Sequence, residues 1–520
     1  MKRHRILLLA LLLASSAAAA PRPRLIVQIV VGSMRAEDLD RYAGQFGEGG
    51  FRRLTEGGTV YSDARYDYQQ TLTPVSLATL TTGAQPSMHG VVGTRWRDYV
   101  DNRPVELVAG RQGPGPYHLI APTLAETLLQ HLPGSQAVSI AAEATSAVVM
   151  AGRGGAALWL DSTHCGWATS GCYTPLPEWI ERSNRERYNR SYVAAEWRPL
   201  LDRDSYRNHR RRDIAAAEST RRKERAVPSC LDLRDDYERL LYTPAGNTAV
   251  LGLAKQAIAQ MRLGRDEETD LMNICLDASR RIAEAYGPES MEVEDMLYRL
   301  DRDLDDFLTF LFAQVDPERV AVVLTSDHGT SPSYDAGPEE GDRFNVRQFE
   351  VIVNGFLNAR YGAGEWVLDY EDKSLYLNHN LIYERGLNLA EVQNEVAIFA
   401  MQFRGVSHAQ SATAVRTSYF GSGYARMMQN SYYPRRSGDV LLNFMPGWIE
   451  QRERCVSMSG SMYGYDTDVP LIFYGPGITG REVRRPVDMT AVAPTLARML
   501  GIRRPAASEG EVLAEVAGEE

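Results

Sequence analysis

Four short runs of apolar residues are spaced along the chain between longer polar stretches. They are RLIVQIVVG at residues 24–32, DLMNICLDAS at 270–279, RVAVVLTSD at 319–327 and DVPLIFYGPG at 468–477. Continuous runs rich in Val, Ile and Leu are typical of strands that are buried on both faces, as in parallel sheets. The pattern therefore predicts four buried parallel strands.

The stretch between the second and third runs has a different period. Residues 290–316 carry apolar side chains at helical spacing, at Val293, Leu297, Leu300, Leu304, Leu308 and Leu311. This spacing predicts an amphipathic helix with acids and arginines on its other face. A strand, a helix and a second strand form a βαβ unit. We therefore predict an α/β fold with a mostly parallel central sheet flanked by helices.

Two long segments interrupt this alternation. Residues near 160–265 are rich in Tyr, Arg and Trp and lack regular strand patterns. The segment near 345–455 contains its own helical pattern at 387–403 and the Tyr-rich NSYYPRRSGD. We interpret both segments as insertions that cap the sheet within one domain spanning residues 21–520.

The first 20 residues have the layout of a secretory signal peptide. Basic residues precede an apolar run from Ile6 to Leu13, and small residues continue to Ala20. The apolar run is shorter than the roughly 20 residues that a membrane span needs. We predict cleavage near residue 20, export across the inner membrane to the periplasm, and no transmembrane segment in the mature chain.

Composition and charge narrow the range of functions. The chain has 520 residues, of which 44% are hydrophobic and 24% charged, so it can bury a large core. Its net charge of −10 argues against nucleic-acid binding. The basic stretch at 207–225 is interpreted as a solvated helical insert. Of the five cysteines, Cys165 and Cys172 are close enough for a small disulfide loop, and two free thiols are the alternative.

The third apolar run ends in Ser-Asp-His-Gly, which places Asp327 and His328 side by side where a strand stops. Ligand sites in α/β sheets lie at the carboxyl ends of the strands. A carboxylate and an imidazole are common ligands of divalent metals. An ordinary polar strand end is the alternative interpretation.

Five segments, some of which overlap the apolar runs described above, follow one another along the chain. They are LIVQIVVGSMRAEDLDRY, TLTPVSLATLTTGAQPSMHGVVGTRW, YGPESMEVEDMLYRLDRDL, LTSDHG and YGYDTDVPLIFYGPGI. Together they resemble the alkaline phosphatase superfamily, especially its phosphate-irrepressible alkaline phosphatase and nucleotide pyrophosphatase/phosphodiesterase branches. The resemblance implies that fold, and hydrolysis of phosphoesters by two divalent metals, usually zinc, with a Ser or Thr nucleophile.

The resemblance also assigns roles to residues around the nucleophile. Thr73 in LTPVS falls on the nucleophile position, although TPVS is equally suited to cap a helix. Thr94 falls where the family has a substrate-contacting Asn. Glu143 and Thr145 fall on the basic pair of the irrepressible branch, and a carboxylate there would repel phosphate.

The family's six metal-ligand positions depart further from its pattern. They fall on Gly32, Arg280, Glu284, Asp327, His328 and Asp468. Asp327 and His328 match the family, whereas Glu284 and Asp468 are altered but are still able to bind a metal. Gly32 has no side chain, and a guanidinium such as that of Arg280 has no lone pair to offer.

Three hypotheses about function follow. The first is a pseudoenzyme, or a strongly impaired hydrolase, that keeps the alkaline phosphatase fold. The second is a phosphomonoesterase or phosphodiesterase that uses Thr73 as nucleophile. Its one divalent ion, zinc or manganese, is held by Asp327, His328 and Thr73, and Arg280 stands in place of the other ion and contacts the phosphate. The third is an envelope protein that binds an anionic or glycan ligand and needs no metal.

Overall fold

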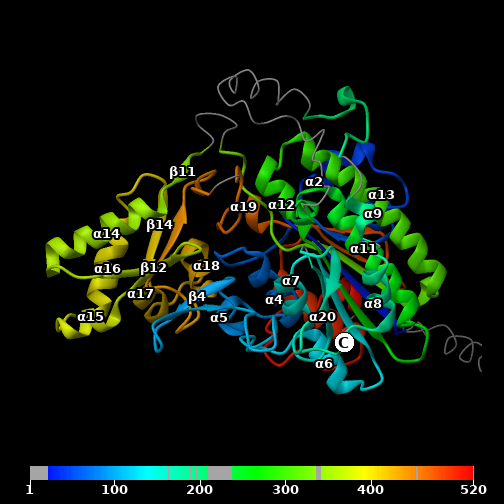
Figure 1. Cartoon of the computed structure of the whole chain (residues 1–520), viewed down its shortest axis with the longest axis horizontal. Helices are drawn as coiled ribbons and strands as arrows, with labels where there is room; N and C mark the ends of the chain where they lie inside the picture. Colours follow the sequence, from blue (N-terminus) through cyan, green and yellow to red (C-terminus); the bar gives the residue numbers. More distant parts are fainter. Residues whose placement is uncertain are drawn as a thin grey trace, which may run out of the picture.

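The computed structural model describes residues 22–161, 163–187, 189–193, 197–208, 237–334, 341–452 and 455–518. The expected leader and most of the basic stretch lie outside these residues. Figure 1 shows two lobes, a core lobe built on a large sheet and a smaller lobe, here called the cap, formed by residues 343–450. No helix of the described residues is long and apolar enough to cross a membrane.

The core lobe is built on a nine-stranded sheet. Its five central strands are parallel and lie in the order β10 (Val320–Ser326), β1 (Leu25–Val31), β9 (Asp270–Leu276), β6 (Ala137–Ala141) and β7 (Ala156–Asp161). The outer strands are β17 (Leu471–Tyr474), β2 (Thr59–Tyr61) and β18 (Arg481–Val483) at one end and β8 (Gly166–Ala168) at the other. The predicted α/β fold with a mostly parallel sheet is confirmed.

One of the four predicted strands runs in the opposite direction. β17 pairs with β10 in antiparallel orientation, so the prediction of four parallel strands was wrong for this one. The chain leaves β10 at the carboxyl edge, passes through the cap and re-enters the sheet with no crossover helix to carry it to the other edge. Without such a crossover a neighbouring strand must run antiparallel.

Helices cover both faces of the sheet because successive side chains of each strand point to opposite sides. On β1, Val27 and Ile29 pack with α11 (Pro244–Gln260) and α13 (Met291–Gln314), whereas Ile26 and Val30 pack with α4 (Thr73–Thr82), α7 (Ala144–Ala151) and α20 (Val492–Met499). α13 is the predicted amphipathic helix. All six of its predicted apolar positions are buried.

The first insertion packs against α13 on the outside of the sheet. Trp197 Nε1 and Tyr206 Oη donate hydrogen bonds to the Asp295 carboxylate, at 2.7 and 2.5 Å. Its described helices include α8 (Glu178–Arg185) and α9 (Arg190–Val193). Cys165 and Cys172 are free thiols.

The cap has a sheet and a hydrophobic core of its own. Its strands lie in the order β12 (Val367–Glu371), β13 (Ser374–Leu377), β15 (Val440–Phe444) and β14 (Val406–Ser411), all antiparallel. Its helices are α14 (Val346–Tyr361), α15 (His379–Glu384), α16 (Leu389–Ala400), α17 (Ala412–Thr417) and α18 (Gly423–Ser431). The sequence predicted α16 but none of these strands. The chain enters at β11 (Arg343–Phe344) and leaves at β16 (Ile449–Glu450), which pair with each other.

The carboxyl ends of the central strands meet at one edge of the sheet, beside the cap. Val31 lies opposite both Ser326 and Leu276 in the strand register. The next residue of each strand, at positions 32, 327 and 277, is therefore brought to the same level. This alignment places most of the residues singled out in the sequence around one point.

Candidate active site

Thr73 stands at the start of α4, with its hydroxyl directed at the end of β10. Its Oγ1 donates to Asp327 Oδ2 at 2.6 Å and lies 3.2 Å from His328 Nε2. The residue that caps α4 is Leu72, which makes no side-chain capping bond. The Thr73 hydroxyl is therefore committed to Asp327 and His328 and does not cap the helix.

Asp327 and His328 are fixed by backbone groups of the adjoining turns. Asp327 Oδ1 accepts from the amides of Ser33 and His328, both at 2.9 Å. His328 Nδ1 lies 2.6 Å from the carbonyl oxygen of Gly329, which leaves Nε2 to face Thr73. The exposed fractions are 0% for Asp327, 1% for His328 and 7% for Thr73, so solvent hardly reaches this group.

A network of four charges fills the adjacent space at the ends of β6 and β9. Arg280, on α12 (Asp277–Tyr286), donates to Glu143 Oε1 at 2.8 Å and to Glu284 Oε1 at 3.0 Å. Arg281 donates to the same Glu143 oxygen at 2.8 Å. Two guanidinium groups and two carboxylates thus balance one another.

The pKa values of this network reflect that balance. Burial alone would lower the pKa of Arg280, but the carboxylates of Glu143 and Glu284 raise it well above its usual value. Burial would raise the pKa of Glu143, yet Arg280 and Arg281 hold it below its usual value. Arg280 and Glu143 are therefore both charged at neutral pH and form an ion pair within the protein.

Gly32 lies where β1 passes closest to α12. A Cβ atom built on Gly32 would lie 2.9 Å from Arg280 Cβ, 3.1 Å from Arg280 N and 3.2 Å from the carbonyl oxygen of Leu276. Real Cβ atoms almost never approach other atoms so closely. The space that a side chain at position 32 would need is therefore taken by the backbone and Cβ of Arg280.

Two other candidate residues are exposed, in contrast to Thr73. Asp468 is exposed, and its Oδ1 accepts from Thr467 Oγ1 at 3.0 Å. Thr94 is also exposed, just before the hairpin of β4 (Arg95–Asp98) and β5 (Arg103–Glu106). Across the described ranges, no three side chains of His, Cys, Asp or Glu gather closely enough to hold a metal ion.

Sequence reasoning missed two charged residues near His328. Asp466 is buried, accepts from the amide and hydroxyl of Ser461 at 2.8 and 2.5 Å, and burial raises its pKa to about 6 despite the opposing charges of Lys373 and His328. Asp466 lies in the quoted YDTD motif, but the family pattern directed attention to Asp468.

Lys373 reaches this region from the cap. It lies in the turn between β12 and β13, where Asp372 and Lys373 have φ of 44° and 64°. Its Nζ donates to the carbonyl oxygens of Ser459 and Gly460 at 3.0 and 2.7 Å. Ser459 Oγ lies 3.5 Å from His328 Nε2. Nothing local in the sequence indicates this long-range contact.

With this geometry established, similarity to known proteins can be assessed. Residues 26–466 match the sequence profile of the family described as type I phosphodiesterase / nucleotide pyrophosphatase. The chain belongs to this family. The match covers all the strands and loops that form the site described above.

Within this phosphodiesterase family, the chain is similar to bacterial alkaline phosphatases. It is 29% identical to alkaline phosphatase PafA of Elizabethkingia meningoseptica over 96% of this chain and 95% of that protein. It is 25% identical to alkaline phosphatase PhoV of Synechococcus elongatus over 95% and 93% of the two chains. The crystal structure of wild-type PafA superposes with a TM-score of 0.87 at 28% identity, covering 96% of this chain and all of that one. The chain is a PafA-like member of the alkaline phosphatase superfamily.

Proposed function

We propose that this PafA-like chain keeps the scaffold of a phosphoesterase but has lost two-metal hydrolysis, and so acts as a pseudoenzyme. The observation that carries the proposal is the ion-pair network of Arg280 with Glu143 and Glu284. It occupies the positions at which the family pattern expects metal ligands and phosphate-binding cations.

The divalent metals typical of this superfamily do not fit the residues present. The second ion's three positions hold Arg280, a cation, Glu284, which is bound to it, and Asp468, which is exposed. The first ion retains Asp327 and His328, but Gly32 has no room for a carboxylate. Catalytic zinc sites normally have three protein ligands besides the open position.

The remaining groups also disfavour a phosphoester substrate. Glu143, an anion, stands at a position where the family pattern has a cation. Arg280 and Arg281 are already paired with carboxylates. Thr73 is almost fully buried and its hydroxyl is bound to Asp327. An unactivated hydroxyl without a metal is a poor nucleophile.

The first test measures metal content and turnover together. The mature chain and its Thr73→Ala and Asp327→Ala variants are incubated with zinc or manganese, dialysed, analysed for bound metal and assayed with p-nitrophenyl phosphate and bis-p-nitrophenyl phosphate. We expect no bound metal and no turnover above that of Thr73→Ala. Metal-dependent turnover that is lost in Thr73→Ala would contradict the proposal that the chain is a pseudoenzyme.

One observation favours a second candidate, the one-metal hydrolase. Asp327 Oδ2 and His328 Nε2 lie 3.3 Å apart, and Thr73 Oγ1 is within 3.2 Å of both. Two ligand atoms of one zinc ion have about this separation when each bond is roughly 2.0–2.2 Å. In the same experiment, one equivalent of metal that disappears in Asp327→Ala would select this candidate.

We further propose that the protein works in the periplasm, on the basis of the secretory pattern in residues 1–20. N-terminal sequencing of the periplasmic fraction should find a chain that begins near residue 21. Recovery of an uncleaved chain in the cytoplasm would contradict this location.

A further inference from the structure

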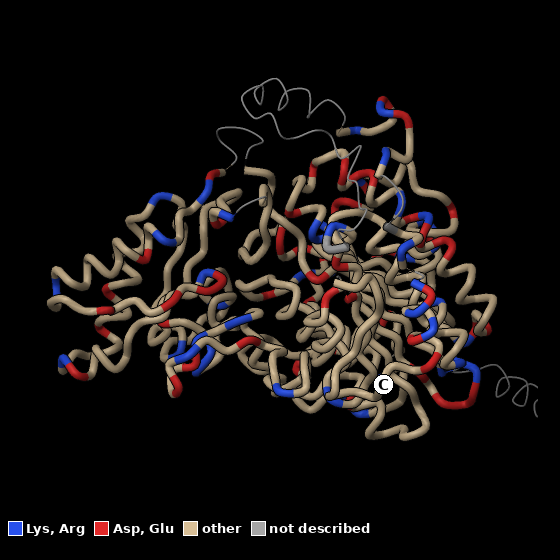
Figure 2. The backbone as a smooth tube through the Cα atoms, viewed as in Figure 1, with Lys and Arg blue, Asp and Glu red and all other residues tan. Residues whose placement is uncertain are grey.

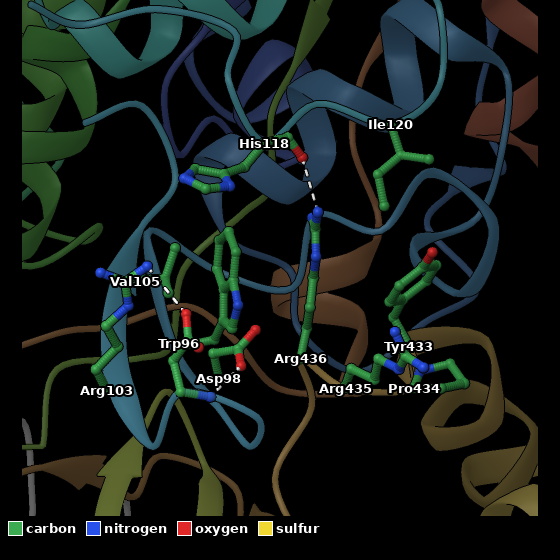
Figure 3. Close-up of a pocket in the computed structure, with 11 residues that line it drawn as sticks. Trp96, Asp98, Arg103, Val105, His118, Ile120, Tyr433, Pro434, Arg435 and Arg436 are labelled. Carbon is green, nitrogen blue, oxygen red and sulfur yellow. Dashed lines mark hydrogen bonds and ion pairs between the residues drawn. The ribbon is translucent and has the colours of Figure 1, made fainter. Parts of the chain in front are cut away.

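A separate pocket lies where the core lobe meets the cap, away from Thr73. Its volume is about 570 Å³, and its walls come from the β4–β5 hairpin, the loop at 118–120 and the segment 433–436. Figure 3 shows side chains from all three segments converging on it. Thr73, Asp327 and Arg280 do not line it.

Arg436 forms the centre of this pocket. Its guanidinium donates to the carbonyl oxygens of Gly90 and of His118, the latter at 3.0 Å, and lies 4.6 Å from the centre of the Trp96 ring. In Figure 3 it stands between Trp96 on one side and Tyr433 on the other. These contacts fix the position of the Arg436 side chain and leave its other N–H groups facing the pocket.

The charge of Arg436 is not matched by a carboxylate. Burial lowers its pKa, and Asp98 and Tyr433 oppose that effect only in part. Within the described part of the chain, no ion pair to Arg436 is present. A partly buried cation that has no carboxylate partner is less favourable than a paired one, and an anionic ligand would reduce that penalty.

The acids that face the pocket are already engaged within the hairpin. Asp98 Oδ1 accepts from the amides of Val100 and Asp101 at 2.8 and 3.0 Å. The Asp101 carboxylate pairs with Arg103 at 3.0 Å. The two amide donors do not cancel the charge of Asp98, so the charged side chains of the lining, which are Asp98, Asp101, Arg103, Arg435 and Arg436, carry a net charge of +1.

Arg435 adds a second cation at the rim. It is exposed, and among the described residues it makes no ion pair. Its φ of 72° lies in the left-handed region, which is uncommon for a residue with a side chain. Residues in such sparsely populated backbone regions cluster at ligand sites.

The pocket is held open by contacts between the lobes. Tyr99, at the tip of the hairpin, donates to Asp439 Oδ2 of the cap at 2.9 Å. Its ring stacks on His379 with ring centres 4.2 Å apart and an angle of 11°. The hairpin is therefore tied to the cap, and a ligand would not have to organise the walls.

We propose that this pocket binds a small organic anion, in which a carboxylate or phosphate-type group contacts Arg435 and Arg436 and a planar ring packs on Tyr433 and Ile120. Ile120 exposes 45% of its surface, which provides an apolar wall beside the guanidinium. Arginine binds both kinds of oxyanion through paired hydrogen bonds. The proposal does not depend on whether the Thr73 site is active.

The experiment is isothermal titration calorimetry on the mature chain with three probes. Phenylphosphonate, which has no ester bond to hydrolyse, and benzoate represent the two oxyanions, and inorganic phosphate lacks the ring. We expect at least one ring-bearing probe to bind and Arg435→Gln to weaken it roughly 10- to 100-fold, as loss of a charged hydrogen bond predicts. Ile120→Trp, which fills the pocket without removing a charge, should abolish binding.

Controls separate this pocket from the Thr73 site and from misfolding. Thr73→Ala and Arg503→Gln, an exposed arginine elsewhere, should leave the affinity unchanged, and circular dichroism checks that each variant is folded. Binding of phenylphosphonate alone identifies a phosphate-type ligand, and binding of benzoate alone a carboxylate. The proposal is overturned if neither probe binds at about 10 mM, if Thr73→Ala removes binding, or if inorganic phosphate binds as tightly as the ring-bearing probes.

Discussion

Gly32 and Arg280 depend on each other, although they are far apart in the sequence. α12 packs so close to the end of β1 that only glycine fits at position 32. The same approach brings the Arg280 guanidinium to Glu143 and Glu284. The glycine at position 32 and the place of the Arg280 side chain are thus two sides of one packing arrangement.

This packing predicts the effect of adding a single methyl group. Gly32→Ala should lower the free energy of unfolding by about 1–3 kcal/mol, because the new Cβ meets backbone that cannot easily shift. The matched control is Gly44→Ala, since a Cβ on Gly44 meets nothing within 4 Å. Urea unfolding measures both variants. Equal stabilities would contradict the close approach of α12.

The residues around Thr73 also show how far sequence reasoning extends. Asp327 and His328 could be selected because they follow a recognisable buried strand, and Thr73 because its segment resembles the family's nucleophile segment. The structure brings the three side chains together. Asp466 and Lys373 could not be selected in this way. Asp466 lies in a quoted motif in which the family pattern points to Asp468 instead, and the position of Lys373 depends on the path of the cap, which no local pattern records.

Among the elements, buried strands and the long amphipathic helix were predictable because their residues have a clear period. α13 has the predicted face, and β1, β9 and β10 match continuous apolar runs. The cap strands lack such runs: β12 has one buried residue in five, and the middle of β14 is only half-buried. The direction of β17 also depended on the intervening cap and not on its own sequence.

The turn between β12 and β13 connects the cap to the loop beside His328. Lys373→Met should expose that loop to solvent exchange, because the carbonyl oxygens of Ser459 and Gly460 lose their donor. Hydrogen–deuterium exchange should become faster at residues 455–461.

Lys255→Met serves as the control for this element. Lys255 is also partly covered, on α11, and pairs with Asp306. The Lys255→Met substitution should leave hydrogen–deuterium exchange at residues 455–461 unchanged. Slow exchange there in Lys373→Met would show that other contacts hold the loop.

At the scale of the whole molecule, two lobes with separate hydrophobic cores share one chain. Figure 2 shows basic and acidic residues interspersed over both lobes. Several carboxyl groups are buried within the core lobe, and burial raises the pKa of Asp38 to about 7 although Arg35 opposes the shift. The stability of the molecule should therefore depend on pH.

The direction of this dependence follows from proton binding. The folded chain holds the Asp38 proton up to about pH 7, whereas an unfolded chain releases it near pH 4. The stabilisation is complete below about pH 4 and is lost as the pH rises through 7. Thermal unfolding should show a fall in stability over that range. Asp38→Asn, which mimics the protonated group, should make the fall in stability with pH less steep. If the fall stays as steep, other buried acids cause it.

The pairing of β11 with β16 brings the entry and exit of the cap side by side. More than 100 residues of the chain thus leave the core lobe and rejoin it at neighbouring points, a geometry that tolerates the insertion and replacement of whole segments. A segment inserted in this way can be replaced as one continuous stretch while β10 and β17 keep their register. Replacement of the cap would change the surface presented beside the Thr73 site without changing the central sheet.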